Sequence, residues 1–213
     1  MTHTNHRKGT IESLRRDYVV FIYPARGIND EGAGLKAEEF LCLGYSHGPV
    51  NAGPARTGDV FLFDPQRVLD RINRVGSAYA VFDDKDKVSA FIKDVVKADF
   101  GVSIIVSGLI DEVGNICREA GIKRHTAQCS LGVWGKTDSL PPEEVLDITT
   151  MCGHGMISSN LVRRMTREVS RGQISFEEAA AKLARPCSCG IFNPRRTQDL
   201  LRVAIEKGVG DLG

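Results

Sequence analysis

The sequence predicts an α/β protein, in which a domain of alternating strands and helices is followed by a C-terminal helical lobe that carries a cysteine cluster. Short apolar runs alternate with segments of helical periodicity up to about residue 136, and only helical patterns follow. Three of the six cysteines lie in two glycine-rich connections of that last part. We therefore expect a flexible tail at 1–15, an α/β domain at 16–136 and a helical metal-binding lobe at 137–213.

The bulk composition is ordinary for a soluble globular protein. The chain has 213 residues, of which 42% are hydrophobic and 26% charged, with a formal net charge of +1. This balance gives no pull toward nucleic acid or an anionic membrane. Neither a run of about 20 apolar residues nor a signal peptide is visible, so a cytoplasmic location is expected. In a reducing compartment, close cysteines indicate metal or redox chemistry more than disulfides.

The first elements follow from apolar runs and their boundaries. The continuous apolar run 18–23, closed by Pro24, predicts a buried strand. The helical spacing of leucine, alanine and phenylalanine predicts a helix over 34–44. The segment 45–58 is rich in glycine, proline and asparagine and predicts a loop, after which 60–63 reads as a short strand.

The middle of the chain continues the alternation. An Asp-Pro pair at 64–65 is a typical helix start. The apolar run 78–82 predicts a strand, and Asp83 or Asp84 caps the helix after it. A further strand is predicted at 102–106.

The last strand of the predicted domain rests on strict alternation. A helix over 110–120, ended by Gly121, comes first. Apolar and polar residues then alternate over 125–134, which predicts a half-buried strand with Cys129 on its apolar side. For residues 78–135 we hypothesise a split βαβ or ferredoxin-like arrangement.

The C-terminal lobe is predicted entirely from helical signals and caps. The signals, in order, are Ser139-Leu-Pro-Pro-Glu-Glu, which opens a helix; an apolar stripe over 156–171 with Gly172 as the stop; a capping box of Ser175 and Glu178; and Asn193-Pro194, which begins the last helix.

The candidate metal ligands are Cys152, Cys187 and Cys189. Each precedes an expected helix start, where unpaired N–H groups and the helix dipole favour a thiolate. The neighbouring Gly153 and Gly190 allow the backbone to approach a bulky inorganic group. The thiolates bring negative charge, which Arg195 and Arg196 could offset.

The fourth metal position is left open by the sequence. His154 could be a ligand, or an acid/base group beside a metal with a vacant position. Cys129 is another candidate, although hydrophobic neighbours favour core positions for it and for Cys42 and Cys117.

A second, weaker site hypothesis concerns the polar loop that carries His47. Loops that leave strands often bind substrates in α/β proteins, so His47 is a catalytic candidate together with His154. Asn51 and Arg26 would accompany it. Trp134 is expected to be a packing residue near the junction of the two parts.

The preferred function is an enzyme of the lyase or hydratase type that uses a [4Fe-4S] cluster as a Lewis acid. Elimination, hydration or desulfuration of a small, anionic molecule would follow, without a membrane or nucleic-acid partner. Two alternatives stay open: a structural zinc-binding interaction module and a metal-free thiol redox protein. The substrate, the metal and homo-oligomer formation stay undecided at this point.

Overall fold

In the part of the chain that the structure describes, four strands form one antiparallel sheet in the order β2-β3-β1-β4. The structure is a computed structural model that describes residues 5–55, 61, 62, 64–69 and 76–210. Its elements are α1 Ile11–Leu14, β1 Tyr18–Tyr23, α2 Ala33–Ser46, β2 Asn51–Pro54, α3 Pro65–Leu69, β3 Ala78–Phe82, α4 Lys85–Ala98, β4 Ser103–Ser107, α5 Ile110–Glu119, a 3-10 turn at Thr137–Ser139, α6 Glu143–Thr149, α7 Ser159–Ser170, α8 Phe176–Ala184 and α9 Pro194–Glu206.

The sheet is built from two split β-α-β units. β3 lies between β1 and β2, and β1 lies between β3 and β4, with every neighbouring pair antiparallel. This is the ferredoxin-like topology. It spans β1 to β4 and not residues 78–135, where the sequence placed it, because the strand expected at 125–134 does not form. The mixed α/β class is as predicted.

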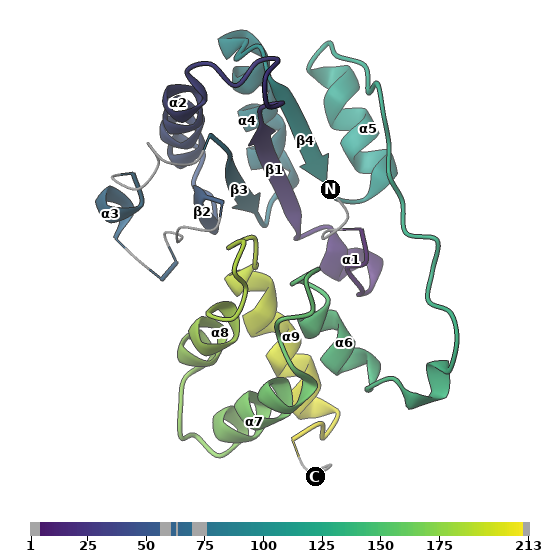
Figure 1. The fold of residues 1–213 in the computed structure, drawn as a ribbon. Coiled ribbons are helices and arrows are strands. Elements are labelled where there is room, and N and C mark those ends of the chain that lie inside the picture. The colour runs from purple at the N-terminus through teal and green to yellow at the C-terminus, as the bar shows by residue number, and fades with distance from the viewer. Residues whose placement is uncertain (1–4, 56–60, 63, 70–75, 211–213) are drawn as a thin grey trace.

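The two faces of the sheet pack against different layers. Side chains alternate along each strand, so that Val20 and Phe82 face α2 and α4 while Phe21 and Tyr79 face the C-terminal helices. Figure 1 shows α6 to α9 as a lobe below the sheet, with α2 and α4 on the upper part. One hydrophobic core thus joins the helical lobe to the sheet.

Local capping explains where several helices begin. The side chains of Asp84, Ser175 and Asn193 each accept a hydrogen bond from the backbone N–H three residues later. These caps confirm the predicted starts of α4, α8 and α9. Gly172 has φ of +67°, which confirms it as the residue that ends α7.

The region between α2 and β3 differs from the prediction. The strand β2 lies inside the segment 45–58 that was expected to be a loop. Phe61 and Leu62 lie in a turn and not in a strand, and the other two residues of the expected strand 60–63 lie outside the described residues. The helix predicted from Asp64-Pro65 forms as α3, and the described part of it ends at Leu69.

The predicted strand 125–134 is wrong. These residues have no regular structure and are exposed, with Leu131 at 88% and Trp134 at 83% exposure. Trp134 is therefore not a packing residue. Cys129 and Cys42 are exposed as well, contrary to their expected core positions, whereas Cys117 is buried as predicted. A strand needs a partner strand, and the described part of the chain pairs none with this segment.

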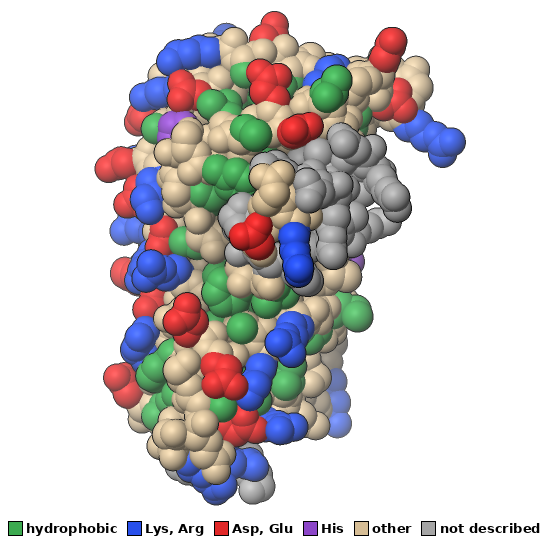
Figure 2. All heavy atoms as spheres, turned by 90° about the vertical axis from the view of Figure 1, so that its left-hand side faces the viewer, with side chains coloured by type: hydrophobic (Ala, Val, Ile, Leu, Met, Phe, Trp, Pro, Cys, Tyr) green, Lys and Arg blue, Asp and Glu red, His purple; other side chains and the backbone are tan. Residues whose placement is uncertain are grey.

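The N-terminal segment, expected to be a flexible tail, contains α1 and buries the side chain of Arg7. No helix among the described residues combines the length and the apolar character that crossing a membrane requires. On the face shown in Figure 2, acidic and basic side chains are intermixed from top to bottom, in keeping with a net charge of +1.

Candidate thiol site

Two tight turns hold the three candidate cysteines. Cys152 follows α6, where its N–H donates to the carbonyl of Thr149 at 3.2 Å and its own carbonyl accepts from Gly155 at 3.0 Å. Cys187 follows α8, and its carbonyl accepts from Gly190 at 3.0 Å. The turn over 187–190 folds the chain back, which brings Cys187 and Cys189 onto the same side.

The structure brings the three thiols together. The sulfur atoms of Cys187 and Cys189 are 3.7 Å apart. Cys152 is close enough to Cys187 that the two thiols shift each other's pKa. The three residues are 1–7% exposed and belong to the core between the sheet and the helices. Cys152 and Cys187, which are 35 positions apart in the sequence, therefore belong to one buried group of thiols.

Hydrogen bonds shift the acidity of these thiols in opposite directions. The bond from Cys187 is the main cause that lowers the pKa of Cys152 to about 5 and that of Cys189 to about 6. The pKa of Cys187 is raised by its interactions with Cys152 and Cys189 and by burial. The cluster therefore favours thiolates at its two ends and a proton on the central sulfur.

Backbone N–H groups further stabilise the two outer thiolates. Those of His154 and Met156 donate to the sulfur of Cys152, and that of Ile191 donates to the sulfur of Cys189. Such N–H donors to sulfur are common around metal-bound thiolates, where they tune the site.

The candidate histidines are placed very differently. His154 is exposed, and its side chain hydrogen-bonds with Cys189. His47 does not reach the thiols. It lies on the other side of the sheet, where Nε2 contacts the Asp94 carboxylate at 3.0 Å and the ring packs against Phe91. His47 therefore does not join the thiol site, and its catalytic role in a second site stays a prediction.

The predicted arginines do not face the sulfurs directly. Arg195 is exposed at the start of α9. Arg196 is 1% exposed and donates to Asp17 at 2.8 Å. Of the neighbouring glycines, Gly153 is exposed. Gly190 is buried with φ of +77°, and a Cβ there would lie 1.9 Å from the hydroxyl oxygen of Tyr79. A glycine at 190 is thus required by both backbone and packing.

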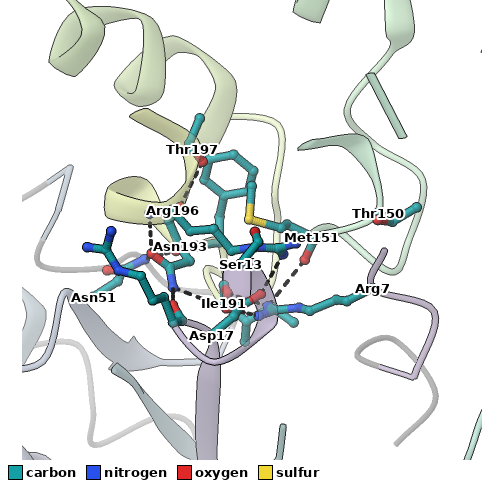
Figure 3. Close-up of polar contacts among 12 residues, drawn as sticks. Arg7, Ser13, Asp17, Asn51, Thr150, Met151, Ile191, Asn193, Arg196 and Thr197 are labelled. Carbon is teal, nitrogen blue, oxygen red and sulfur yellow. Dashed lines mark hydrogen bonds and ion pairs between the residues drawn. The ribbon is translucent and has the colours of Figure 1, made fainter. Parts of the chain in front are cut away.

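Two side chains that sequence reasoning underrated fix the cysteine turns (Figure 3). Asn51 donates to the carbonyls of Gly190 at 2.6 Å and Phe192 at 3.1 Å. Arg7 donates to the carbonyl of Ile191 at 2.8 Å. The sequence places Asn51 in the His47 loop, and an arginine in a polar N-terminal stretch carries no local signal. Only the fold could reveal these roles.

The thiols do not form a ready-made metal site. Among the described residues, no group of three or more His, Cys, Asp or Glu side chains is arranged so that it could hold a metal ion. Cys187 interacts with both of the other thiols. A cavity of about 600 Å³ lies elsewhere, along α5, with Arg118, Lys123 and Arg124 among its lining residues.

The ferredoxin-like sheet with a helical lobe defines the class of fold. Comparisons with protein-family models, curated proteins and solved structures each give no match. The function must therefore be argued from the site itself.

Proposed function

We propose that the protein binds a soft metal through the thiolates of Cys152, Cys187 and Cys189. The observation that carries this proposal is the contact among three thiols from two separate turns, with thiolates favoured at both ends. Clustered thiolates select zinc, copper(I) or iron–sulfur centres. Ordinary core cysteines would not need several N–H donors directed at their sulfurs.

The sulfur spacing supports a single ion best. Two thiolates on one tetrahedral zinc, at a Zn–S distance of about 2.3 Å, stand roughly 3.8 Å apart. Cys187 and Cys189 are 3.7 Å apart. In a [4Fe-4S] cluster each thiolate binds a different iron, which spreads the sulfurs further.

Metal binding would require a local rearrangement. The proton that Cys187 shares with its neighbours must leave, and the side chains must turn toward a common point. The exposed turn 153–156 lies beside the sulfurs and provides the side from which an ion can enter. His154, which already contacts Cys189, is the nearest candidate for the fourth position.

The second candidate function is the iron–sulfur enzyme. The observation that favours it is the set of backbone N–H donors from residues 154, 156 and 191 to the outer sulfurs. When bound, a [4Fe-4S] cluster would supply a Lewis acid for elimination, hydration or desulfuration of a small, anionic molecule. His154, being exposed, would be the residue that exchanges a proton with such a substrate.

Metal and sulfide analysis of protein purified without oxygen tests the proposal. We expect one zinc per chain in the wild type and a loss of zinc in Cys187→Ala. Cys129→Ala is the matched control, because Cys129 is an exposed cysteine outside the cluster and should leave the metal content unchanged.

Other results would change the conclusion. If the protein contains iron and acid-labile sulfide in equal amounts, the bound group is an iron–sulfur cluster and not zinc. A protein that stays metal-free when supplied with either metal would overturn both candidates. A disulfide between Cys187 and Cys189 in that sample would then favour thiol redox chemistry, although cysteines separated by one residue form strained disulfides.

A further inference from the structure

Arg7 lies between the two cysteine turns and donates to both. Its Nη2 donates to the carbonyl of Ile191 at 2.8 Å and to that of Met151 at 3.3 Å (Figure 3). Met151 directly precedes Cys152, and Ile191 is two residues after Cys189. One guanidinium thus links the two chain segments that hold the thiols.

The same guanidinium belongs to a buried network of charges. Its Nη1 donates to the Asp17 carboxylate, whose other oxygen accepts from Arg196. The side chains of Arg7, Asp17 and Arg196 are 5%, 0% and 1% exposed. Two guanidinium groups therefore contact one carboxylate, and the next acid that acts on Arg196 is the half-buried Asp147.

Neighbouring contacts hold Arg7 in place. The backbone N–H of Lys8 donates to the hydroxyl of Thr150 at 3.0 Å, and the Lys8 carbonyl accepts from Arg196. The segment that precedes α1 is thus attached to the end of α6 and to α9, on either side of the cysteine turns.

We propose that Arg7 is a positioning residue of the thiol site. It holds the turns of Cys152 and Cys189 at a fixed separation through its bonds to the Met151 and Ile191 carbonyls. This inference rests on the proposed metal binding. The planar guanidinium makes three bonds at once, to Asp17 and to the two carbonyls. A lysine supplies the charge without that geometry.

Zinc affinity of full-length variants tests this role. Competition with a chromogenic chelator would measure the affinity of Arg7→Gln, Arg7→Lys and the wild type. We expect about 10- to 100-fold weaker binding for Arg7→Gln, as for other residues that orient metal ligands. Arg7→Lys should recover part of the loss. Arg16→Gln is the matched control, since Arg16 is about half exposed and pairs with Asp199, and it should bind within twofold of the wild type.

A second control separates positioning from general stability. Leu201→Ala removes a fully buried side chain of α9 in the same core and does not touch the cysteine turns through hydrogen bonds. If Arg7 only stabilises the fold, Leu201→Ala and Arg7→Gln will weaken zinc binding equally. That result overturns the inference, as does wild-type affinity in Arg7→Gln. If circular dichroism shows that Arg7→Gln does not fold, the zinc affinity of Arg7→Lys is the test. A wild-type zinc affinity of Arg7→Lys would then refute the inference.

Failure of metal binding would be visible separately. If the wild type binds neither zinc nor cobalt(II), the proposed function is wrong whatever Arg7 does. Arg7 would then be judged by alkylation of Cys152 and Cys189, followed by mass spectrometry. Faster alkylation in Arg7→Gln than in Leu201→Ala supports a role in holding the turns, and equal rates reject it. In the metal-binding case, the thiolate charge-transfer absorption of cobalt(II) should weaken in Arg7→Gln and stay normal in Arg16→Gln.

Discussion

Two irregular segments of this chain both contain cysteine, glycine and apolar residues, yet the cysteines of one are buried and the cysteine of the other is exposed to solvent. The cysteine link, residues 185–193 between α8 and α9, buries Cys187 and Cys189. The exposed segment, residues 121–136 after α5, leaves Cys129 and Trp134 in solvent. The sequence predicts a strand within the exposed segment and a connection between two helices for the cysteine link.

The difference lies in what each segment finds elsewhere in the chain. In the cysteine link, three consecutive carbonyls, of residues 190 to 192, accept hydrogen bonds from Asn51 and Arg7. The hydrogen bonds of the exposed segment include one between His6 and Ser130 and a local one from Trp134 to the carbonyl of Leu131. Irregular backbone is held when distant side chains satisfy its polar groups. Alternating apolar residues that lack a partner strand are not held in place.

The largest expected effect is on the charge network behind the cysteine link. Asp17→Ala leaves the guanidinium groups of Arg7 and Arg196 buried without their shared carboxylate. We expect the free energy of unfolding to fall by about 3–5 kcal/mol, measured by urea denaturation. Asp199→Ala removes the same charge from an exposed position and should cost less than about 1 kcal/mol. Equal losses in the two variants would show that the buried charge network stabilises the fold no more than an exposed ion pair does.

A smaller loss is expected from Gly190→Ala. The new Cβ would meet the Tyr79 hydroxyl and would sit on a residue with positive φ, so that overpacking and backbone strain together should cost about 2–4 kcal/mol. Gly155→Ala is the matched control, because Gly155 also has positive φ but open space around it. Its cost should be about 1 kcal/mol. Thermal unfolding at matched pH compares them, and similar values would rule out the packing argument.

Asn51→Ala, which removes an anchor of the cysteine link, should lower the free energy of unfolding by about 2 kcal/mol. Two buried carbonyls lose their donor. The loss of the Asn51 Oδ1 atom, which has no hydrogen-bond partner among the described residues, offsets part of the cost. Asn29→Ala removes a residue that also makes two hydrogen bonds, one of them at the surface, and we expect about 1 kcal/mol or less. The measurement is the urea midpoint of each variant. A loss in Asn51→Ala no greater than in Asn29→Ala would contradict the anchoring role.

The smallest effect is expected in the exposed segment. Trp134→Ala should change the free energy of unfolding by less than about 0.5 kcal/mol, because its side chain is 83% exposed. Trypsin should cut the folded wild type first after Lys123, Arg124 or Lys136, all of which are exposed. A loss above about 1 kcal/mol, or resistance of these sites to trypsin, would mean that the segment packs against something, such as a second copy of the chain.

Much of the secondary structure could be predicted because its causes are local. The strands β1 and β3 follow from uninterrupted apolar runs. The starts of α4, α8 and α9 follow from caps whose bonds span three residues. The strand β2 escaped prediction because Asn51–Pro54 has turn-like composition and becomes a strand through its pairing with β3.

The candidate site also has features that the sequence predicts and features that only the fold reveals. The donor atoms and their turns were visible in the sequence, since Cys152, Cys187 and Cys189 stand in short glycine-rich segments. The roles of Arg7 and Asn51 were not, because their bonds join residues more than 130 positions apart. His47 illustrates the opposite case, a plausible loop histidine that the sheet separates from the thiols.

The sequence by itself determined which groups are present and where most helices and strands begin and end, since capping bonds and hydrophobic periodicity act within a few residues. Tertiary structure decided which thiols meet, which arginine links their turns and which apolar segment stays in solvent. Those outcomes depend on partners far away in the chain, and a hydrogen bond or a strand pair exists only when the fold places both partners within contact distance.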